Sequence, residues 1–170
     1  MHLPAIFSFS RLSRCRRGSA AVEMALVLPL LTALLFGSVE LGRYFLNEHA
    51  LIKAVREAAR FAARQKFADM PCNGQPAPEQ AAAIRNLVRF GNIAGTGSPR
   101  RPNWRADANV AVSIACVSGN WSGIYAEHPQ GTPVVTVSAV VPYVPLLGTL
   151  GLGAPVLHVR AEAQSAVTGL

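Results

Sequence analysis

Charged residues are scarce in this chain of 170 residues, and acidic ones are the scarcest. Charged side chains make up 15% of the sequence against 51% hydrophobic residues, and nine acidic residues stand against sixteen basic ones. This composition excludes a disordered tail, which needs low hydrophobicity and high charge. It also disfavours an ordinary cytosolic domain, in which about a quarter of the residues are charged. The net charge of +7 points to a nucleic-acid partner only if its placement fits one.

Motifs for catalysis and for ligand binding are also missing. No GxSxG nucleophile elbow is present. The glycine-rich stretch GTLGLGAP lacks the lysine and the strand–turn–helix context of a phosphate loop. The histidines make no metal-ligand spacing with the cysteines, because they lie far apart, at His2, His49, His128 and His158. We therefore expect no enzymatic activity, no metal and no cofactor.

The positive charge begins in a basic leader, residues 1–18, which contains no acid. Its arginines are Arg11, Arg14, Arg16 and Arg17. An apolar run follows directly, and Met24–Val39 carries no charge. About twenty apolar residues in a helix span the roughly 30 Å hydrocarbon core of a bilayer, so we expect a transmembrane helix over residues 19–42. Because a basic flank stays in the cytoplasm, the sequence predicts a single-pass protein with its N-terminus inside and the remainder exported.

Three other interpretations compete with a membrane anchor. A buried core helix can be equally apolar, but it would not follow directly on four arginines. A cleaved secretory signal has the same order of charge and apolar residues, yet no convincing small-x-small cleavage site and helix break follow Phe36. A cytosolic nucleic-acid binder would use the basic cluster, but no aromatic or recognition-helix pattern accompanies it. We expect lipid contact and no nucleic-acid partner, with a helix bend at Pro29 in mid-span.

A helical rhythm of apolar residues continues past the apolar run and predicts an amphipathic extension over residues 43–70. Its end is expected near residues 68–70, where a Pro- and Gly-rich linker begins. The apolar stripe either docks on the chain's own domain, which we favour beyond Val55, or forms a shaft that packs against other subunits. The opposite face carries Lys53, Arg56, Glu57, Arg60 and Arg64. A short second helix is expected in EQAAAIRNLVRFGN, closed by Gly91.

Three segments of alternating apolar residues predict half-buried strands, at 108–117, 133–141 and 156–167. Three such strands form a small antiparallel sheet, and its apolar face needs a cover. The upstream amphipathic helix is the natural cover. The predicted fold class is therefore α+β: a long N-terminal transmembrane helix that continues into an amphipathic helix packed on a three-stranded antiparallel sheet. Residues 71–170 form the small head.

The predicted topology determines the redox state that we expect for each of the three cysteines. Cys15 lies on the cytoplasmic side, where it stays reduced. Cys72 and Cys116 are then the exported pair, and a disulfide between them would stabilise the head by roughly 4 kcal/mol on the chain-entropy model. The alternative is two unpaired thiols in a small core.

Arg100, Arg101 and Arg105 surround Trp104 in a loop-like segment. This cluster supports a second hypothesis, a membrane-anchored periplasmic binding module that holds an anionic ligand through the Trp104 loop. A solvated loop explains the same residues, and we favour it.

Glu23 is unexplained by the membrane helix alone, because a carboxylate in hydrocarbon is costly unless it is paired. A basic leader ending in Gly18, then Ser19, with a glutamate five places after the glycine, resembles the class III signal of type IV prepilins and pseudopilins. The segment RRGSAAVEMALVLPLLTALLFGSVELGRYF, followed by EAARFAAR, resembles the TadE-like family of tight-adherence (Tad/Flp) pilus assembly proteins. Met24 replaces the aromatic residue usual in that family.

The resemblance implies a pilin-like fold and a pseudopilin that assists assembly of a tight-adherence pilus or secretion apparatus. It implies a location in the bacterial inner membrane, with a periplasmic head and with other pilins, pseudopilins and platform proteins as partners. It also implies cleavage after Gly18 by a prepilin peptidase, so that Ser19 becomes the N-terminus. Glu23 would then pair with the Ser19 amine of a neighbouring subunit, as an assembly determinant. Residues 19–170 carry a net charge of +3, so more than half of the +7 belongs to the leader.

Overall fold

A computed structural model describes residues 18–72, 74–101, 104, 110–119, 121–149 and 157–169. The leader arginines, Cys15 and Arg105 lie outside the described residues. The chain divides into two compact units, one that ends at Leu41 and one that runs from Gly42 to Leu170. From here on we call the second unit the head; it is larger than the predicted head of residues 71–170, because it includes the last part of the first helix.

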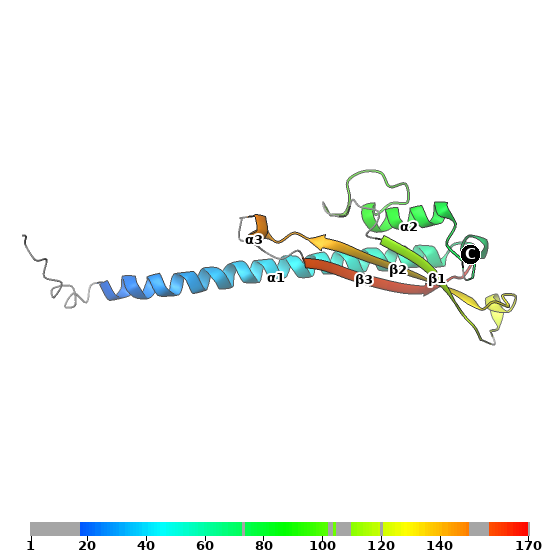
Figure 1. Cartoon of the computed structure of the whole chain (residues 1–170), viewed down its shortest axis with the longest axis horizontal. Coiled ribbons are helices and arrows are strands. Elements are labelled where there is room, and N and C mark those ends of the chain that lie inside the picture. Colours follow the sequence, from blue (N-terminus) through cyan, green and yellow to red (C-terminus); the bar gives the residue numbers. More distant parts are fainter. Residues whose placement is uncertain are drawn as a thin grey trace, which may run out of the picture. The chain divides into compact units, whose positions relative to one another are not determined.

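The first helix, α1 (Ser19–Ala63), is a continuous α-helix of 45 residues that contributes to both units (Figure 1). It ends before the predicted end near residues 68–70. The amides of Arg64 and Gln65 bond to carbonyls three residues back, those of Phe61 and Ala62. Such bonds tighten and close a last helical turn. A separate short 3₁₀ helix, η3 (Phe67–Asp69), then occupies the rest of the predicted helix.

The head contains the predicted three-stranded antiparallel sheet, in the order β1-β2-β3. Its strands are β1 (Val110–Val117), β2 (Thr132–Tyr143) and β3 (Leu157–Ala166). In this register Val137 of β2 lies opposite Val112 of β1 and Ala163 of β3, so one face gathers the apolar residues of all three strands. The α+β fold class expected from the sequence is confirmed.

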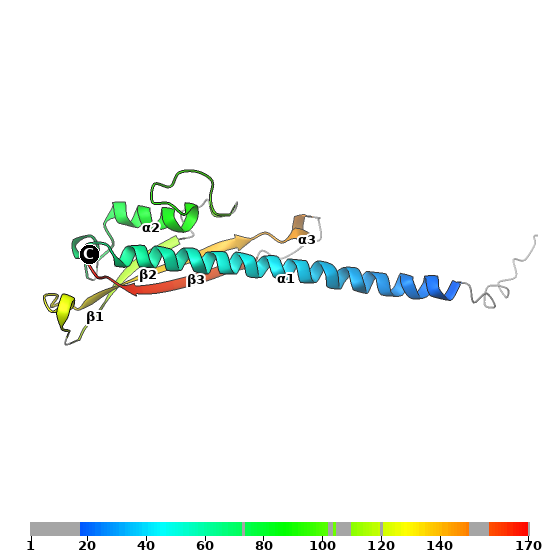
Figure 2. The same cartoon turned by 180° about the vertical axis from the view of Figure 1, so that it is seen from behind.

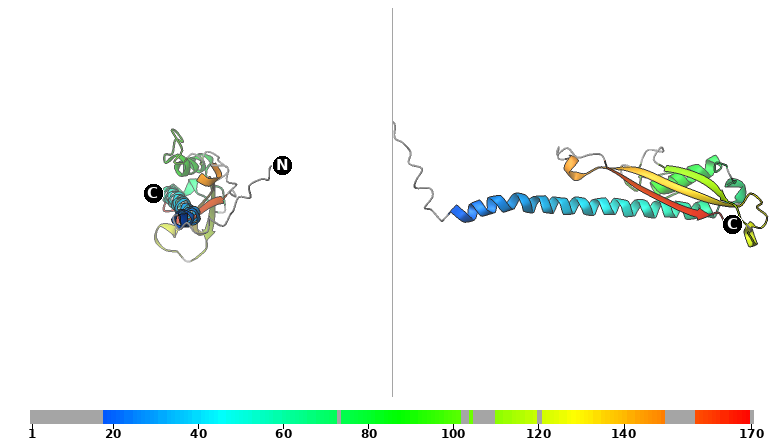
Figure 3. Two further views of the ribbon diagram at one scale, coloured as in Figure 1. Left: turned by 90° about the vertical axis from the view of Figure 1, so that its left-hand side faces the viewer. Right: turned by 60° about the horizontal axis from the view of Figure 1, so that its bottom comes forward.

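The last part of α1 covers this apolar face, as Figures 2 and 3 show. Val135 and Val137 of β2 are fully buried, and Val159 of β3 is nearly so. Among the predicted alternatives, the amphipathic stretch therefore docks on its own domain. Most of its buried residues are alanines, which let the helix lie close to the sheet: Leu51, Ala54, Val55, Ala58, Ala59, Ala62 and Ala63. The Tyr44 and Tyr143 rings also meet edge to face, with centroids 5.4 Å apart.

The predicted second helix is α2 (Pro78–Phe90). A proline at a first helical position loses no hydrogen bond, and Gly91 ends the helix with a positive φ of 79° that glycine adopts without strain. Ile84, Leu87 and Val88 extend the same core. Two short helices, η5 (Gly123–Tyr125) and α3 (Leu146–Thr149), lie in the segments before and after β2.

Candidate functional site

The part of α1 in the first unit presents large apolar side chains that nothing in that unit buries. Leu26 is 74% exposed, and the whole most apolar stretch of the helix has no buried residue. The cost of exposing apolar area to water is about 25 cal/mol per Å², so the exposed side chains of this stretch favour lipid or a protein partner over water. Among the described residues, α1 is the one helix long and apolar enough to cross a membrane.

The predicted processing residues lie at the start of this helix. Gly18 immediately precedes α1, and Ser19 is its first residue. Among the described residues beyond its direct neighbour, none lies within 4 Å of where a Gly18 side chain would begin. Glu23 is exposed, four residues after Ser19. Residues four apart share one face of a helix, so the side chains of Ser19 and Glu23 lie on the same side of α1. Cleavage at Gly18 and the pairing of Glu23 stay predictions.

Pro29 lies inside α1 without ending the helix. It has no N–H to donate to the carbonyl of Ala25, one turn earlier. One turn later, the Thr32 hydroxyl donates a hydrogen bond of 2.9 Å to the Pro29 carbonyl. This bond does not replace the one missing at Ala25, but membrane helices tolerate proline in their interior. The bend at Pro29 also stays a prediction.

The disulfide between Cys72 and Cys116 is present, with the two Cα atoms 5.4 Å apart. It joins the segment after η3 to the inward face of β1, across 44 residues of sequence. Disulfides persist in oxidising compartments. The bond therefore agrees with an exported head.

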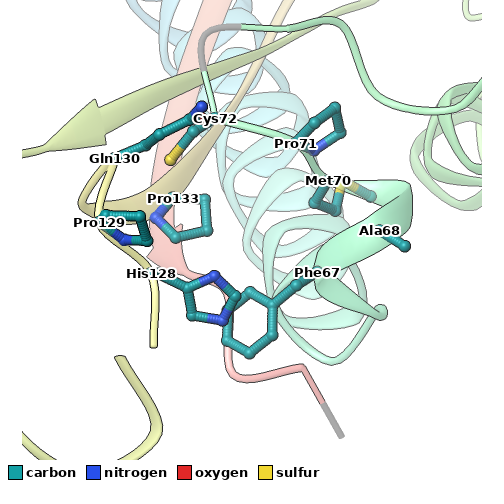
Figure 4. A pocket seen from close by; sticks show the side chains of 9 residues that line it. All are labelled: Phe67, Ala68, Met70, Pro71, Cys72, His128, Pro129, Gln130 and Pro133. Carbon is teal, nitrogen blue, oxygen red and sulfur yellow. The ribbon is translucent and has the colours of Figure 1, made fainter. Parts of the chain in front are cut away.

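A pocket of about 350 Å³ lies beside this disulfide. Figure 4 shows the Phe67 and His128 rings lying against each other at its edge, with their centroids 4.0 Å apart. The other lining residues are mainly apolar: Ala68, Met70, Pro71, Cys72, Pro129, Gln130 and Pro133. No nucleophile lies beside a general base in this lining. Among the described residues, no group of His, Cys, Asp and Glu could hold a metal ion.

Trp104 does not lie in a solvated loop, which was the favoured interpretation, and it presents no exposed ring to a ligand. Trp104 is only 2% exposed and belongs to the head core. Its carbonyl accepts a hydrogen bond of 3.0 Å from Nε of the largely buried Arg89. Arg100 instead reaches back to α1, where its guanidinium lies 2.6 Å from the Glu57 carboxylate. The anionic-ligand hypothesis thus loses the aromatic surface on which it depended.

The structure also assembles a surface that the sequence analysis missed, and we call it the basic groove. It lies between α1 and β3 and is lined on the β3 side by Ala163, Gln164, Ser165 and Ala166. The other side is formed by basic residues of α1, which the sequence analysis placed on the face opposite the apolar stripe: Lys53, Arg56, Arg60 and Arg64. Arg100 joins them from the loop after α2. The four-residue spacing on α1 was visible in the sequence, but the neighbouring strand edge was not.

Comparison with known families identifies the N-terminal part of the chain. The family described as TadE-like protein matches residues 18–60, which contain Gly18, Ser19, Glu23, Pro29 and most of α1. Neither a curated protein nor a solved structure matches the chain. The matched segment includes the exposed apolar stretch and much of the helix that covers the sheet.

Proposed function

We propose that this chain, whose residues 18–60 match the family described as TadE-like protein, is a pilin-like membrane protein that assists assembly of a tight-adherence type IV pilus or secretion apparatus. The observation that supports the proposal is the change from exposed to buried apolar side chains along α1. The same uninterrupted helix exposes its apolar residues up to Leu41 and buries its small apolar residues from Leu51 onward. A helix that anchors in lipid and also forms the spine of a small exported head suits a pilin-like subunit. The role proposed is structural, not enzymatic.

The orientation follows from charge and from the disulfide. The four leader arginines hold the N-terminus in the cytoplasm. The head then lies in the periplasm of a bacterial cell, where Cys72 and Cys116 can be oxidised. The inner membrane is the proposed location, with one pass through the bilayer.

Processing would change the chemistry of the start of α1. A prepilin peptidase that cuts after Gly18 leaves a positive amine on Ser19, at the membrane. A buried carboxylate is tolerable when it has a partner of opposite charge, so Glu23 would accept the Ser19 amine of a neighbouring subunit. This contact would set the register between α1 helices, with pilins, pseudopilins and platform proteins as the partners.

N-terminal sequencing of the chain purified from the membrane fraction tests the proposal. We expect the sequence to begin at Ser19, and Gly18→Leu to leave the leader attached. Glu23→Gln should leave the cleaved protein in the membrane but impair pilus assembly, because it removes the charge that pairs with the amine. Glu127→Gln, an exposed head residue, is the matched control and should assemble normally. An intact leader on the wild-type protein, together with normal assembly by Glu23→Gln, would refute the proposal.

A further inference from the structure

Positive charge is concentrated in the basic groove far more than in the remainder of the chain. The residues that line it and the pocket next to it include one acid, Glu57, and six basic residues: Lys53, Arg56, Arg60, Arg64, Arg100 and Arg101. A second acid, Glu162, is not among these lining residues but accepts a hydrogen bond from the side chain of Gln164. The net charge of +5 on the lining residues exceeds the +3 of residues 19–170, so the rest of that segment is net negative. Glu57 is paired with Arg100, and among the described residues the other five basic side chains form no ion pair. Such an arrangement favours an anionic partner.

The floor of the basic groove is the edge of a sheet. β3 is the last strand in the order β1-β2-β3, and no described strand pairs with its outer side. Every second residue of an antiparallel edge strand points its backbone N–H and C=O away from its neighbour. An edge of this kind is a template for one further strand. The chain therefore places backbone donors and acceptors beside a row of cations.

The spacing of the cations matches the repeat of an extended chain. Arg56, Arg60 and Arg64 follow each other at four-residue intervals, about 6 Å along the helix axis. Alternate residues of a strand, which share one face, are about 6.6–6.8 Å apart. α1 and β3 run in the same direction along the groove. Lys53–Arg60 and Ala163–Ser165 line one part of it, and the later residues Ala63 and Thr168 line the next part. The Thr168 amide donates a 2.7 Å hydrogen bond to the Ala63 carbonyl and closes that end of the groove.

From this geometry we propose that the basic groove binds an extended acidic segment of another protein, which adds to the edge of β3 as a fourth strand. Acidic residues at every second position would face the cations of α1, and carboxylates form short, charge-assisted hydrogen bonds with arginine. The roughly 16 Å from Lys53 to Arg64 accommodates about five residues of such a strand. This proposal concerns the head alone and goes beyond the role in pilus assembly, so either can fail without the other.

The test measures peptide binding to the full chain held in nanodiscs of zwitterionic phosphatidylcholine. The probe is a synthetic peptide of about ten residues that alternates Glu and Thr, long enough for an average strand. We expect binding that weakens as salt is raised, and slower amide hydrogen exchange in β3 when the peptide is bound. Methylating alternate backbone nitrogens of the peptide should abolish binding, because it removes the strand hydrogen bonds and keeps the charge.

Two double variants distinguish binding in the basic groove from a general effect of the protein's net charge. Arg56→Glu/Arg60→Glu should weaken binding at least about tenfold, because it reverses two charges that face the peptide. Lys66→Glu/Arg85→Glu makes the same change in net charge at residues that lie outside both the basic groove and β3, and this variant should bind almost as the wild type does. An intact Cys72–Cys116 bond and an unchanged circular dichroism spectrum establish that each variant is folded. Absence of peptide binding overturns the proposal. The proposal is also overturned if the methylated peptide binds as tightly as the unmethylated one. It is overturned as well if heparin binds and slows hydrogen exchange in β3 to the same extent, because a site for any polyanion would then explain the binding.

Discussion

The two parts of α1 are both rich in apolar residues but differ in the size of those residues and in whether the structure buries them. Up to Leu41 the helix is rich in leucine, with Leu26, Leu30 and Leu34 each more than 60% exposed. From Leu51 to Ala63 the buried residues are mostly alanine, and Ala54, Ala58 and Ala62 have no exposed area. The side chains thus become smaller where the helix meets the sheet.

This difference teaches that apolar content alone does not determine what a helix packs against. Large branched side chains project far from the helix axis and suit a fluid environment such as lipid. Small ones bring the backbone close to a sheet whose own residues, valines on the inner face, fill the remaining space. The predictions below alter one part of the comparison and leave the other unchanged.

The largest effect is expected from the disulfide, which belongs to the head alone. Replacing both cysteines, Cys72→Ser/Cys116→Ser, should lower the free energy of unfolding of the head by about 4 kcal/mol, because it frees a loop across 44 residues. Urea unfolding followed by tryptophan fluorescence measures this. Membrane retention after carbonate extraction should not change. If this variant lost both membrane retention and head stability, the two parts of the molecule would not be independent.

A charge placed in the exposed apolar part of α1 should have the next largest effect. It should impair membrane retention and leave the stability of the head unchanged, the reverse of the disulfide variant. Leu31→Arg places a cation in the predicted bilayer, at a cost of about 2.5–3.5 kcal/mol on insertion scales. The variant should be lost from the carbonate-resistant membrane fraction. Leu46→Arg is the control, since Leu46 is equally exposed but lies past the predicted span. Equal retention of both variants would contradict the assignment of residues 19–42 to the membrane.

The same substitution, alanine to leucine, can be made in each of the two parts of α1 to compare them directly. Ala58→Leu enlarges a fully buried residue at the helix–sheet contact and should destabilise the head by about 1–3 kcal/mol. Ala33→Leu makes the same change where the side chain is exposed and should leave head stability unaffected. Denaturant midpoints of the two variants provide the measurement. A midpoint for Ala58→Leu equal to that of the wild type would mean that the helix does not pack closely on the sheet.

The smallest effect is expected from the ion pair of Glu57 with Arg100. Both side chains are partly exposed, so Glu57→Gln should change the free energy of unfolding by less than about 1 kcal/mol. The change should shrink further in high salt. A loss of several kcal/mol would show that this pair, and not the apolar contact, holds the loop after α2 on α1.

Much of the fold could be predicted because each element carries its own local pattern. The alternation in β1, β2 and β3 indicated which residues face inward, and Gly91 marked the end of α2. The end of α1 was placed too late, because apolar rhythm does not show where turn hydrogen bonds close a helix. The choice between docking and an exposed shaft also needed the structure, since both use the same apolar stripe.

The surfaces of the head were harder to predict, because they combine residues from distant segments. Trp104 resembled an exposed loop residue, flanked as it is by arginines, yet its indole belongs to the core. The partner of Glu57 is Arg100, 43 residues later, and a contact at that separation leaves no pattern in the local sequence. The basic groove needed both α1 and β3, and no local pattern relates Arg60 to Gln164.

Photo-crosslinking in native membranes tests most directly the claim that one helix lies in two environments. A photoreactive phenylalanine analogue placed at Leu28 is compared with the same residue at Lys53, since both positions are exposed on α1. The account predicts lipid adducts at Leu28 and none at Lys53. Lipid adducts at Lys53, or a Leu28 adduct to the head of its own chain with none to lipid, would contradict it.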